Sequence, residues 1–282
     1  MNSNELDIDD LVNYVMKKND ISNVPLQKYY RLKWFLNALE KDLFTFQKPS
    51  TWDDPFEDFI SKLTNSSKKA FVNGLNISND IYAMSTINKR SECDGMWKNF
   101  ANTTGVLIHT NSKKIIKSLI SYLLDNGCCS NRNLYLGGQD VRNQLAGAIK
   151  LKKIDYRPDS DIAKLFKDAT NHTLLDYNHL AFEMLSIKRM EYDYESEYRV
   201  FLVANLLGLE ESLFLGAGYF KKTIDKIVLS PKVSQTRINR LTSVLINKYQ
   251  MDKNIIETSK LYDLQYFKDR YDLGRILPIN EE

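Results

Sequence analysis

The chain has 282 residues, is 43% hydrophobic and 11% aromatic, and carries 39 Lys and Arg against 36 Asp and Glu. This composition excludes a disordered chain, and the length fits one large domain or two small ones. A formal charge of +3 neither requires nor excludes a nucleic acid or an anionic membrane as a partner.

The apolar pattern predicts helices and strands that alternate irregularly along the chain. From the N-terminus, the expected elements are a helix at 6–18, a strand at 26–31, a helix with Phe35, Leu36 and Leu39 facing inward, and a strand at 43–46. A helix starting at Asp54 and a strand at 81–86 follow. The next expected elements are a short helix from Asp94, a strand at 106–110 and a helix from Ser112 to about 126. After a loop at 128–147 with a short helix following Gln139, they are a strand at 149–156, a mostly helical segment at 161–188, strands at 197–205 and 224–229, a helix at 234–249 and a strand at 255–259.

Strands and helices without regular βαβ spacing favour the α+β class. We therefore expect a mixed, mostly antiparallel central sheet with flanking helices. The expected organisation is an N-terminal helical extension at 1–22, a single α+β domain at 23–262 and a C-terminal tail at 263–282.

Cysteine usage and the apolar runs indicate the compartment. Cys93 and the adjacent Cys128 and Cys129 lack the spacing of a disulfide framework or a zinc site, which indicates reduced thiols. The acidic, polar first residues do not resemble a secretory signal, and the apolar runs are too short to span a bilayer. These features predict a cytoplasmic protein without a membrane partner.

The common phosphate-loop, dinucleotide-binding, HExxH and GxSxG motifs are missing from the sequence. Of the three histidines, His109, His172 and His179, none has a neighbour at metal-ligand spacing apart from the loose pair His172 and His179, so we expect no metal. Any catalysis is therefore expected to use carboxylates, Arg, Ser and Tyr.

The segment at 188–202, KRMEYDYESEYRVFL, is the strongest candidate for a functional site. In a strand, Glu195, Glu197 and Arg199 would share one face, with Ser196 and Tyr198 on the other. Carboxylates beside an apolar run are costly to bury without partners. They therefore indicate either a polar cleft or an exposed strand start with cross-strand ion pairs.

A second acidic group, Asp53-Asp54-Pro55-Phe56-Glu57, has two interpretations. Asp54 as N-cap, Pro55 at N1 and Glu57 at N3 form a helix start. Alternatively, Asp53, Asp54 and Glu57 could bind a divalent cation.

Four blocks together resemble the bacterial family catalogued as domain of unknown function 2971, over about residues 26–260. The blocks are Lys28-Tyr29-Tyr30-Arg31, Trp52 to Glu57, Ser85-Thr86 followed by Met96-Trp97 and Gly105-Val106, and Lys188 to Arg199. Three positions depart from the family pattern: Asp53 in place of Asn, Phe100 in place of Tyr and Tyr192 in place of Trp. The name of this family implies no particular activity.

A weaker similarity is to ADP-ribosyltransferases of the arginine–serine–glutamate type, on Arg31, Ser85-Thr86-Ile87 and Glu195-Ser196-Glu197. Ile87 departs from the Ser expected there. The resemblance implies that NAD is the substrate, with Glu197 stabilising the ribosyl cation, Glu195 orienting or activating the acceptor, and Arg31 binding pyrophosphate or ribose. NAD contacts would also come from Ser85, Thr86, Trp97, Tyr192 and Arg199.

This resemblance implies an ADP-ribosyltransferase-like fold and a transferase that modifies protein or nucleic acid. It would act as a toxin or phage-defence effector with an antitoxin or defence-system partner. The alternative is a non-enzymatic binding or regulatory module of a bacterial defence system, in which the Glu-x-Glu-x-Arg strand is an ion-pair node. A third hypothesis, a metal-dependent hydrolase, depends on Asp53.

Overall fold

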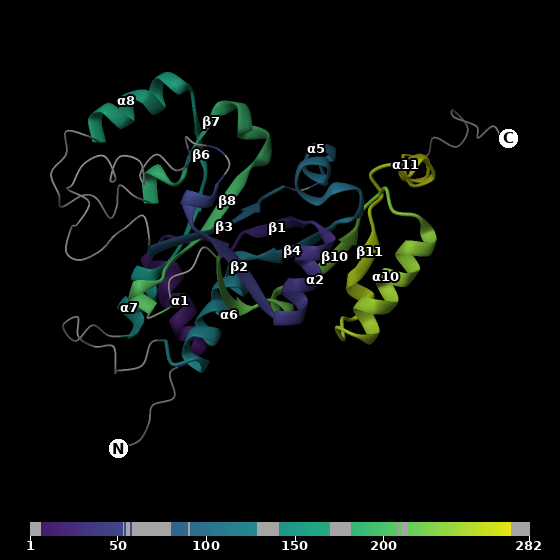
Figure 1. Ribbon diagram of the computed structural model, residues 1–282, viewed down its shortest axis with the longest axis horizontal. Helices are drawn as coiled ribbons and strands as arrows, with labels where there is room; N and C mark the ends of the chain where they lie inside the picture. Colours follow the sequence, from purple (N-terminus) through teal and green to yellow (C-terminus); the bar gives the residue numbers. More distant parts are fainter. Residues whose placement is uncertain are drawn as a thin grey trace, which may run out of the picture. The chain divides into compact units, whose positions relative to one another are not determined.

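The computed structural model describes residues 7–52, 54, 57, 80–89, 91–128, 141–169, 182–207, 209 and 214–271 (Figure 1). Residue contacts divide the chain into two compact units. Unit 1 comprises Met1–Lys28, Ala38–Lys89 and His109–Ile224, and unit 2 comprises Tyr29–Asn37, Arg90–Ile108 and Asp225–Glu282.

The sheet of unit 1 is organised around β3 (Ile81–Ile87), which pairs along its length with β8 (Glu197–Val203). β8 also pairs with β5 (Ile149–Lys153). Near opposite ends, β3 pairs with β2 (Leu43–Gln47) and β1 (Pro25–Tyr30). β2 continues the sheet to β9 (Phe214–Tyr219), and all of these pairings are antiparallel. A separate parallel pair joins β6 (Asp155–Arg157) and β7 (Ile187–Arg189).

Helices of unit 1 bury the apolar faces that their sequences predict. They are α1 (Ile8–Lys18), α6 (Ser112–Asp125), α7 (Val141–Ala148) and α8 (Asp159–Ala169). α1 packs against α6 and α7. The apolar face of α6, formed by Ile115, Ile116, Leu119, Ile120 and Leu123, is fully buried, and the Asn111 side chain caps the helix N-terminus by accepting from the Lys114 N–H.

Unit 2 contains α5 (Asp94–Met96), continued by a π-helical turn at Trp97–Ala101, and the start of β4 (Val106–Asn111). β4 is next to β10 (Lys226–Leu229), which pairs in parallel with β11 (Ile256–Thr258). The helices α10 (Gln235–Asn247) and α11 (Leu264–Arg270) follow β10 and β11 in the chain. Three of the five unit boundaries fall within elements, namely β1, α2 (Leu32–Lys41) and β4.

The α+β class with a mostly antiparallel sheet and flanking helices is confirmed. The prediction missed β9, because Gly216 and Gly218 interrupt its apolar pattern. Gly218 has a φ of +78°, which favours glycine, and a Cβ at Gly216 would lie 3.0 Å from Leu43 Cδ1.

Two predicted boundaries were wrong. The expected strand at 149–156 is divided, because the Ile154 N–H donates to Glu197 O while the Asp155 N–H donates to Ser186 O. The end of the predicted helical segment is instead β7, whose residues pair with β6. Residues 129–140 of the predicted loop at 128–147 lie outside the described residues, as does most of the helix expected to start at Asp54, while the short helix expected after Gln139 corresponds to α7.

Candidate functional site

The candidate site lies in unit 1, at the start of β8. The β8 register places Glu197 opposite Ile87 and Arg199 opposite Ser85 of β3. Both charged residues are buried, with exposed fractions of 3% for Glu197 and 1% for Arg199. As predicted, they share one face of the strand, since the Arg199 Nε donates to Glu197 Oε1 at 2.7 Å.

Arg199 has acceptors for several of its guanidinium N–H groups. Its Nη2 donates to Glu57 Oε2 at 2.6 Å, and its Nη1 donates to the Leu185 carbonyl at 2.7 Å. The Trp52 ring covers the guanidinium, with 4.4 Å from Cζ to the ring centroid. Burial alone would lower the pKa of Arg199, but the attraction of Glu197 and Glu57 raises it. Arg199 therefore stays protonated and does not act as a general acid or base.

Lys188, from β7, is the second cation of the site and is shared by three carboxylates. Its Nζ lies 2.7 Å from Glu195, 3.0 Å from Glu57 and 3.4 Å from Glu197. The Tyr192 ring centroid is 4.7 Å from the same nitrogen. Burial would lower the pKa of Lys188, but these carboxylates raise it, so Lys188 stays protonated.

The three glutamates have different electrostatic environments. Burial would raise the pKa of Glu197, but Arg199, Lys188 and the Ser85 hydroxyl lower it to about 2. At Glu195, burial is the largest effect and raises the pKa despite Lys188. Of Glu195 and Glu197, Glu195 is therefore the carboxylate that accepts a proton more readily.

The predicted strand alternation is wrong at Glu195. Met190–Glu195 form a 3₁₀ helix, and Ser196 follows in the left-handed conformation with a φ of 50°. β8 therefore begins only at Glu197. Glu195 nevertheless joins the site, because this turn directs its carboxylate to Lys188.

Ser85 and Lys28 meet Glu197 from the neighbouring strands. The Ser85 hydroxyl hydrogen-bonds to the Glu197 carboxylate, while the Ser85 carbonyl accepts from Lys28 Nζ at 2.7 Å. Lys28 is half-buried, and its burial lowers its pKa to about 8, although the Glu197 charge acts in the opposite direction. β1, β3 and β8 thus bring a cation, a hydroxyl and a carboxylate together.

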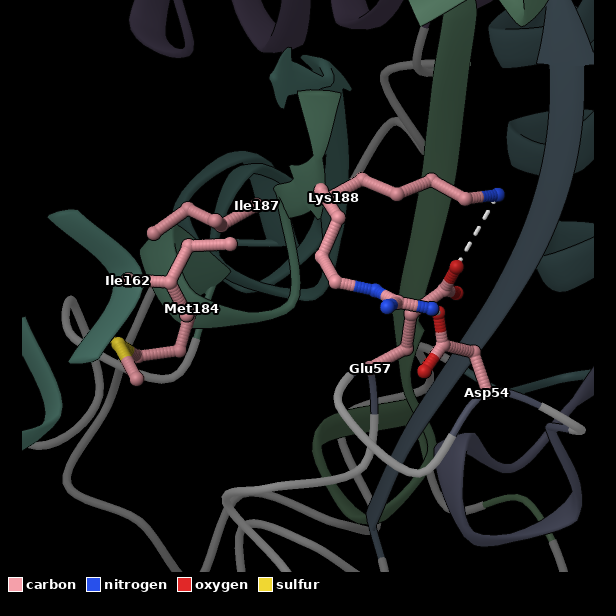
Figure 2. Close-up of a pocket in the computed structure, with 7 residues that line it drawn as sticks. Asp54, Glu57, Ile162, Met184, Ile187 and Lys188 are labelled. Carbon is pink, nitrogen blue, oxygen red and sulfur yellow. Dashed lines mark hydrogen bonds and ion pairs between the residues drawn. The ribbon is translucent and has the colours of Figure 1, made fainter. Parts of the chain in front are cut away.

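A small pocket adjoins these charges. Its cavity volume is only about 10 Å³, which is room for about one water molecule. In Figure 2, Asp54, Glu57 and Lys188 line one side of the pocket. The apolar residues Ile162, Met184 and Ile187 line the other side.

Asp54 and Glu57 both contribute to this site. The Glu57 N–H donates to Asp54 O, and the Asp54 carboxylate lies 3.3 Å from Arg189 Nη2. Arg189 also donates to the Tyr192 hydroxyl. The carboxylates of Asp54 and Glu57 thus lie in the site, whereas Asp53 lies outside the described residues.

The structure brings together only part of the predicted set. Thr86 is buried beside the site and donates to Tyr198 O. Trp97 belongs to unit 2 and is 3% exposed, with its indole N–H donating to Glu92 at 2.9 Å. Arg31 is exposed and also belongs to unit 2.

The sequence interpretation gave no role to Lys28, Lys188 or Trp52 and treated Glu57 mainly as a capping residue. The sequence does indicate that cations are needed here, because two glutamates next to an apolar strand require positively charged partners if they are buried. Lys188, seven residues before Glu195, was the nearest candidate in the chain besides Arg189 and Arg199.

Comparisons of this chain with protein-family models, with curated proteins and with solved structures found no match. Within the described ranges, no helix is long and apolar enough to cross a membrane. In the same part of the chain, no group of three His, Cys, Asp or Glu residues could hold a metal ion.

The low pKa of Glu197 predicts acid-sensitive stability. Because its pKa falls from 4.5 to about 2 on folding, ionised Glu197 stabilises the fold above pH 4.5, and this contribution disappears as the pH falls towards 2. We expect Glu197→Gln to lower the free energy of unfolding by roughly 3 kcal/mol at pH 6, and progressively less between pH 4.5 and 2.

Urea unfolding of both proteins at several pH values between 6 and 2 checks this expectation. Glu257→Gln is the matched control, because Glu257 forms an exposed pair with Lys226 and is expected to contribute under about 1 kcal/mol. A difference between wild type and Glu197→Gln that stays constant over this pH range would contradict the assignment.

Proposed function

We propose that this protein is an NAD-dependent ADP-ribosyltransferase that modifies protein or nucleic acid and acts as a toxin or phage-defence effector. The observation that carries the proposal is the hydrogen bond of the Ser85 hydroxyl to the Glu197 carboxylate. The middle-strand serine and the late glutamate lie far apart in the sequence, yet the β3–β8 register places Ser85 opposite Arg199, two residues from Glu197 on the same strand.

The proposed reaction breaks the bond between nicotinamide and ribose. The electron pair of this bond leaves with nicotinamide, and positive charge develops on the ribose, as in glycoside cleavage. An ionised carboxylate held in place beforehand stabilises that cation more than it stabilises the ground state. Glu197, with a pKa of about 2, is ionised at neutral pH and suits this role.

The remaining charges supply the other requirements of this reaction. Glu195, whose pKa is raised by burial, suits the acceptance of a proton from the acceptor nucleophile. Lys28, with a pKa of about 8, is mainly cationic at neutral pH and suits a dinucleotide phosphate. Tyr192 offers an aromatic ring beside Lys188, which lines the pocket. The proposed chemistry does not use Arg31.

The test is incubation of the purified protein with labelled NAD and cell lysate, next to the Glu197→Gln variant. We expect the wild type to transfer label, and Glu197→Gln to reduce the rate by about 100-fold or more, the cost of removing one charge-stabilising group. Glu257→Gln should transfer label at the wild-type rate. Equal transfer by wild type and Glu197→Gln would exclude Glu197 from the chemistry.

A second candidate is a non-enzymatic binding or regulatory module of a bacterial defence system. The observation in its favour is that the Glu197 carboxylate already accepts hydrogen bonds from Arg199, Lys188 and Ser85. A carboxylate has about four acceptor positions, so a ribose hydroxyl must displace one of these donors. This candidate predicts no NAD cleavage, no thermal shift with NAD and a large fall in melting temperature for Glu197→Ala.

A further inference from the structure

Unit 2 carries most of the exposed aromatic surface of the described residues. Among these residues, eleven large hydrophobic side chains are exposed, and eight of them belong to unit 2. Five fall within residues 262–271, where α11 lies (Figure 1). The exposed fractions there include 50% for Tyr262, 42% for Tyr266, 49% for Phe267 and 55% for Tyr271.

Cations accompany three of these rings. Lys232 Nζ lies 5.5 Å from the Tyr262 ring centroid, and Lys260 Nζ lies 6.0 Å from that of Tyr266. Arg270 Cζ lies 5.6 Å from the centroid of Tyr271. We call Tyr262, Tyr266, Phe267 and Tyr271, together with these three cations, the α11 surface.

The net charge of unit 2 is positive. Its described residues include twelve Lys and Arg against seven Asp and Glu, a balance of +5, whereas the whole chain carries only +3. Positive charge is therefore concentrated in the unit that also exposes the aromatic rings. A polyanion with planar apolar groups complements both properties.

We infer that the α11 surface binds single-stranded nucleic acid. Unpaired bases offer faces that stack on exposed rings, and phosphates pair with the neighbouring cations. A duplex covers its base faces, and an acidic peptide has no regular series of planar rings. A membrane surface favours a continuous apolar face, whereas Asp263, Asp269 and Arg270 interrupt the apolar side chains of this segment. This binding goes beyond the proposed transferase reaction and does not depend on NAD.

The test is fluorescence anisotropy with fluorescein-labelled oligothymidylate of about 15 nucleotides and no NAD. We expect binding that weakens about tenfold or more between roughly 50 and 200 mM salt, as expected when about three phosphates are neutralised. Tyr266→Ala and Tyr271→Ala should each weaken binding about fivefold or more, because each removes a stacking ring. Lys260→Ala should reduce the salt dependence.

Phe214→Ala is the matched control, because Phe214 is an aromatic residue of unit 1 that is 55% exposed. It should leave the oligonucleotide affinity unchanged, and circular dichroism should confirm that every variant is folded. Any of four results would overturn the inference: no binding, equal binding of a duplex of the same length, equal loss in Phe214→Ala, or binding of phosphatidylserine vesicles without binding of the oligonucleotide. Competition by polyglutamate as effective as that by polythymidylate would also overturn it.

Discussion

Replacing Arg199 with Met is expected to destabilise the protein by about 3–5 kcal/mol, because it leaves three buried carboxylates with Lys188 as their shared cation. Arg199 is 1% exposed and donates to both Glu197 and Glu57. Methionine fills a similar volume but provides no donors, so these carboxylates must become protonated or admit water. A fall in the urea midpoint, followed by circular dichroism, measures the loss.

Arg157→Met is the control for this prediction. Arg157 pairs with Asp155 at 2.6 Å, but both side chains are substantially exposed, so the expected loss is below about 1 kcal/mol. Arg199→Lys should fall between these two variants, since one ammonium cannot reproduce the geometry of the guanidinium. Equal losses in Arg199→Met and Arg157→Met would show that burial of the cluster contributes nothing.

Gly105→Ala is expected to destabilise the protein by about 3 kcal/mol or more through overpacking. A Cβ at this position would lie 2.2 Å from Tyr30 O, 2.3 Å from Ala101 O and 2.6 Å from Ala101 Cβ. Two of these neighbours are backbone atoms, so the backbone itself must move. Gly105 also presents its carbonyl to the Ser230 N–H at 3.2 Å, and such movement would disturb this bond.

Gly95→Ala provides the comparison for Gly105→Ala within the same unit. Its nearest neighbour would be Cys93 Sγ at 3.9 Å, an ordinary contact, and Gly95 lies in α5. We expect this variant to be neutral or to gain up to about 1 kcal/mol from helix propensity. Thermal unfolding measures both variants, and an unchanged melting temperature for Gly105→Ala would contradict the steric argument.

The sequence predicted those features that depend on local periodicity. The buried face of α6 and the start of β8 follow from apolar spacing, and Glu197 and Arg199 share a face because side chains alternate along a strand. Glu195 was placed in that strand wrongly, because Ser196 adopts a left-handed conformation that is uncommon for serine.

The partners of the charged residues could not be predicted from local pattern. Glu57 and Arg199 are 142 residues apart, and the role of Lys28 depends on how β1 pairs with β3. Such contacts depend on strand order, which periodicity does not determine. The helix-capping interpretation accounts for Asp54 and Glu57 from the neighbouring residues alone. It therefore does not predict their ion pairs with residues far away in the chain.

The Arg199–Glu57 ion pair also has a consequence for the order of folding events. Closing a loop of 142 residues carries an entropic cost that is recovered only when the strands around the pair are already in register. We therefore expect the charges to come together after the β3–β8 ladder has formed and to contribute little to the folding transition state. On this expectation the cluster mainly slows unfolding, which extends the lifetime of the native state and leaves the folding rate almost unchanged.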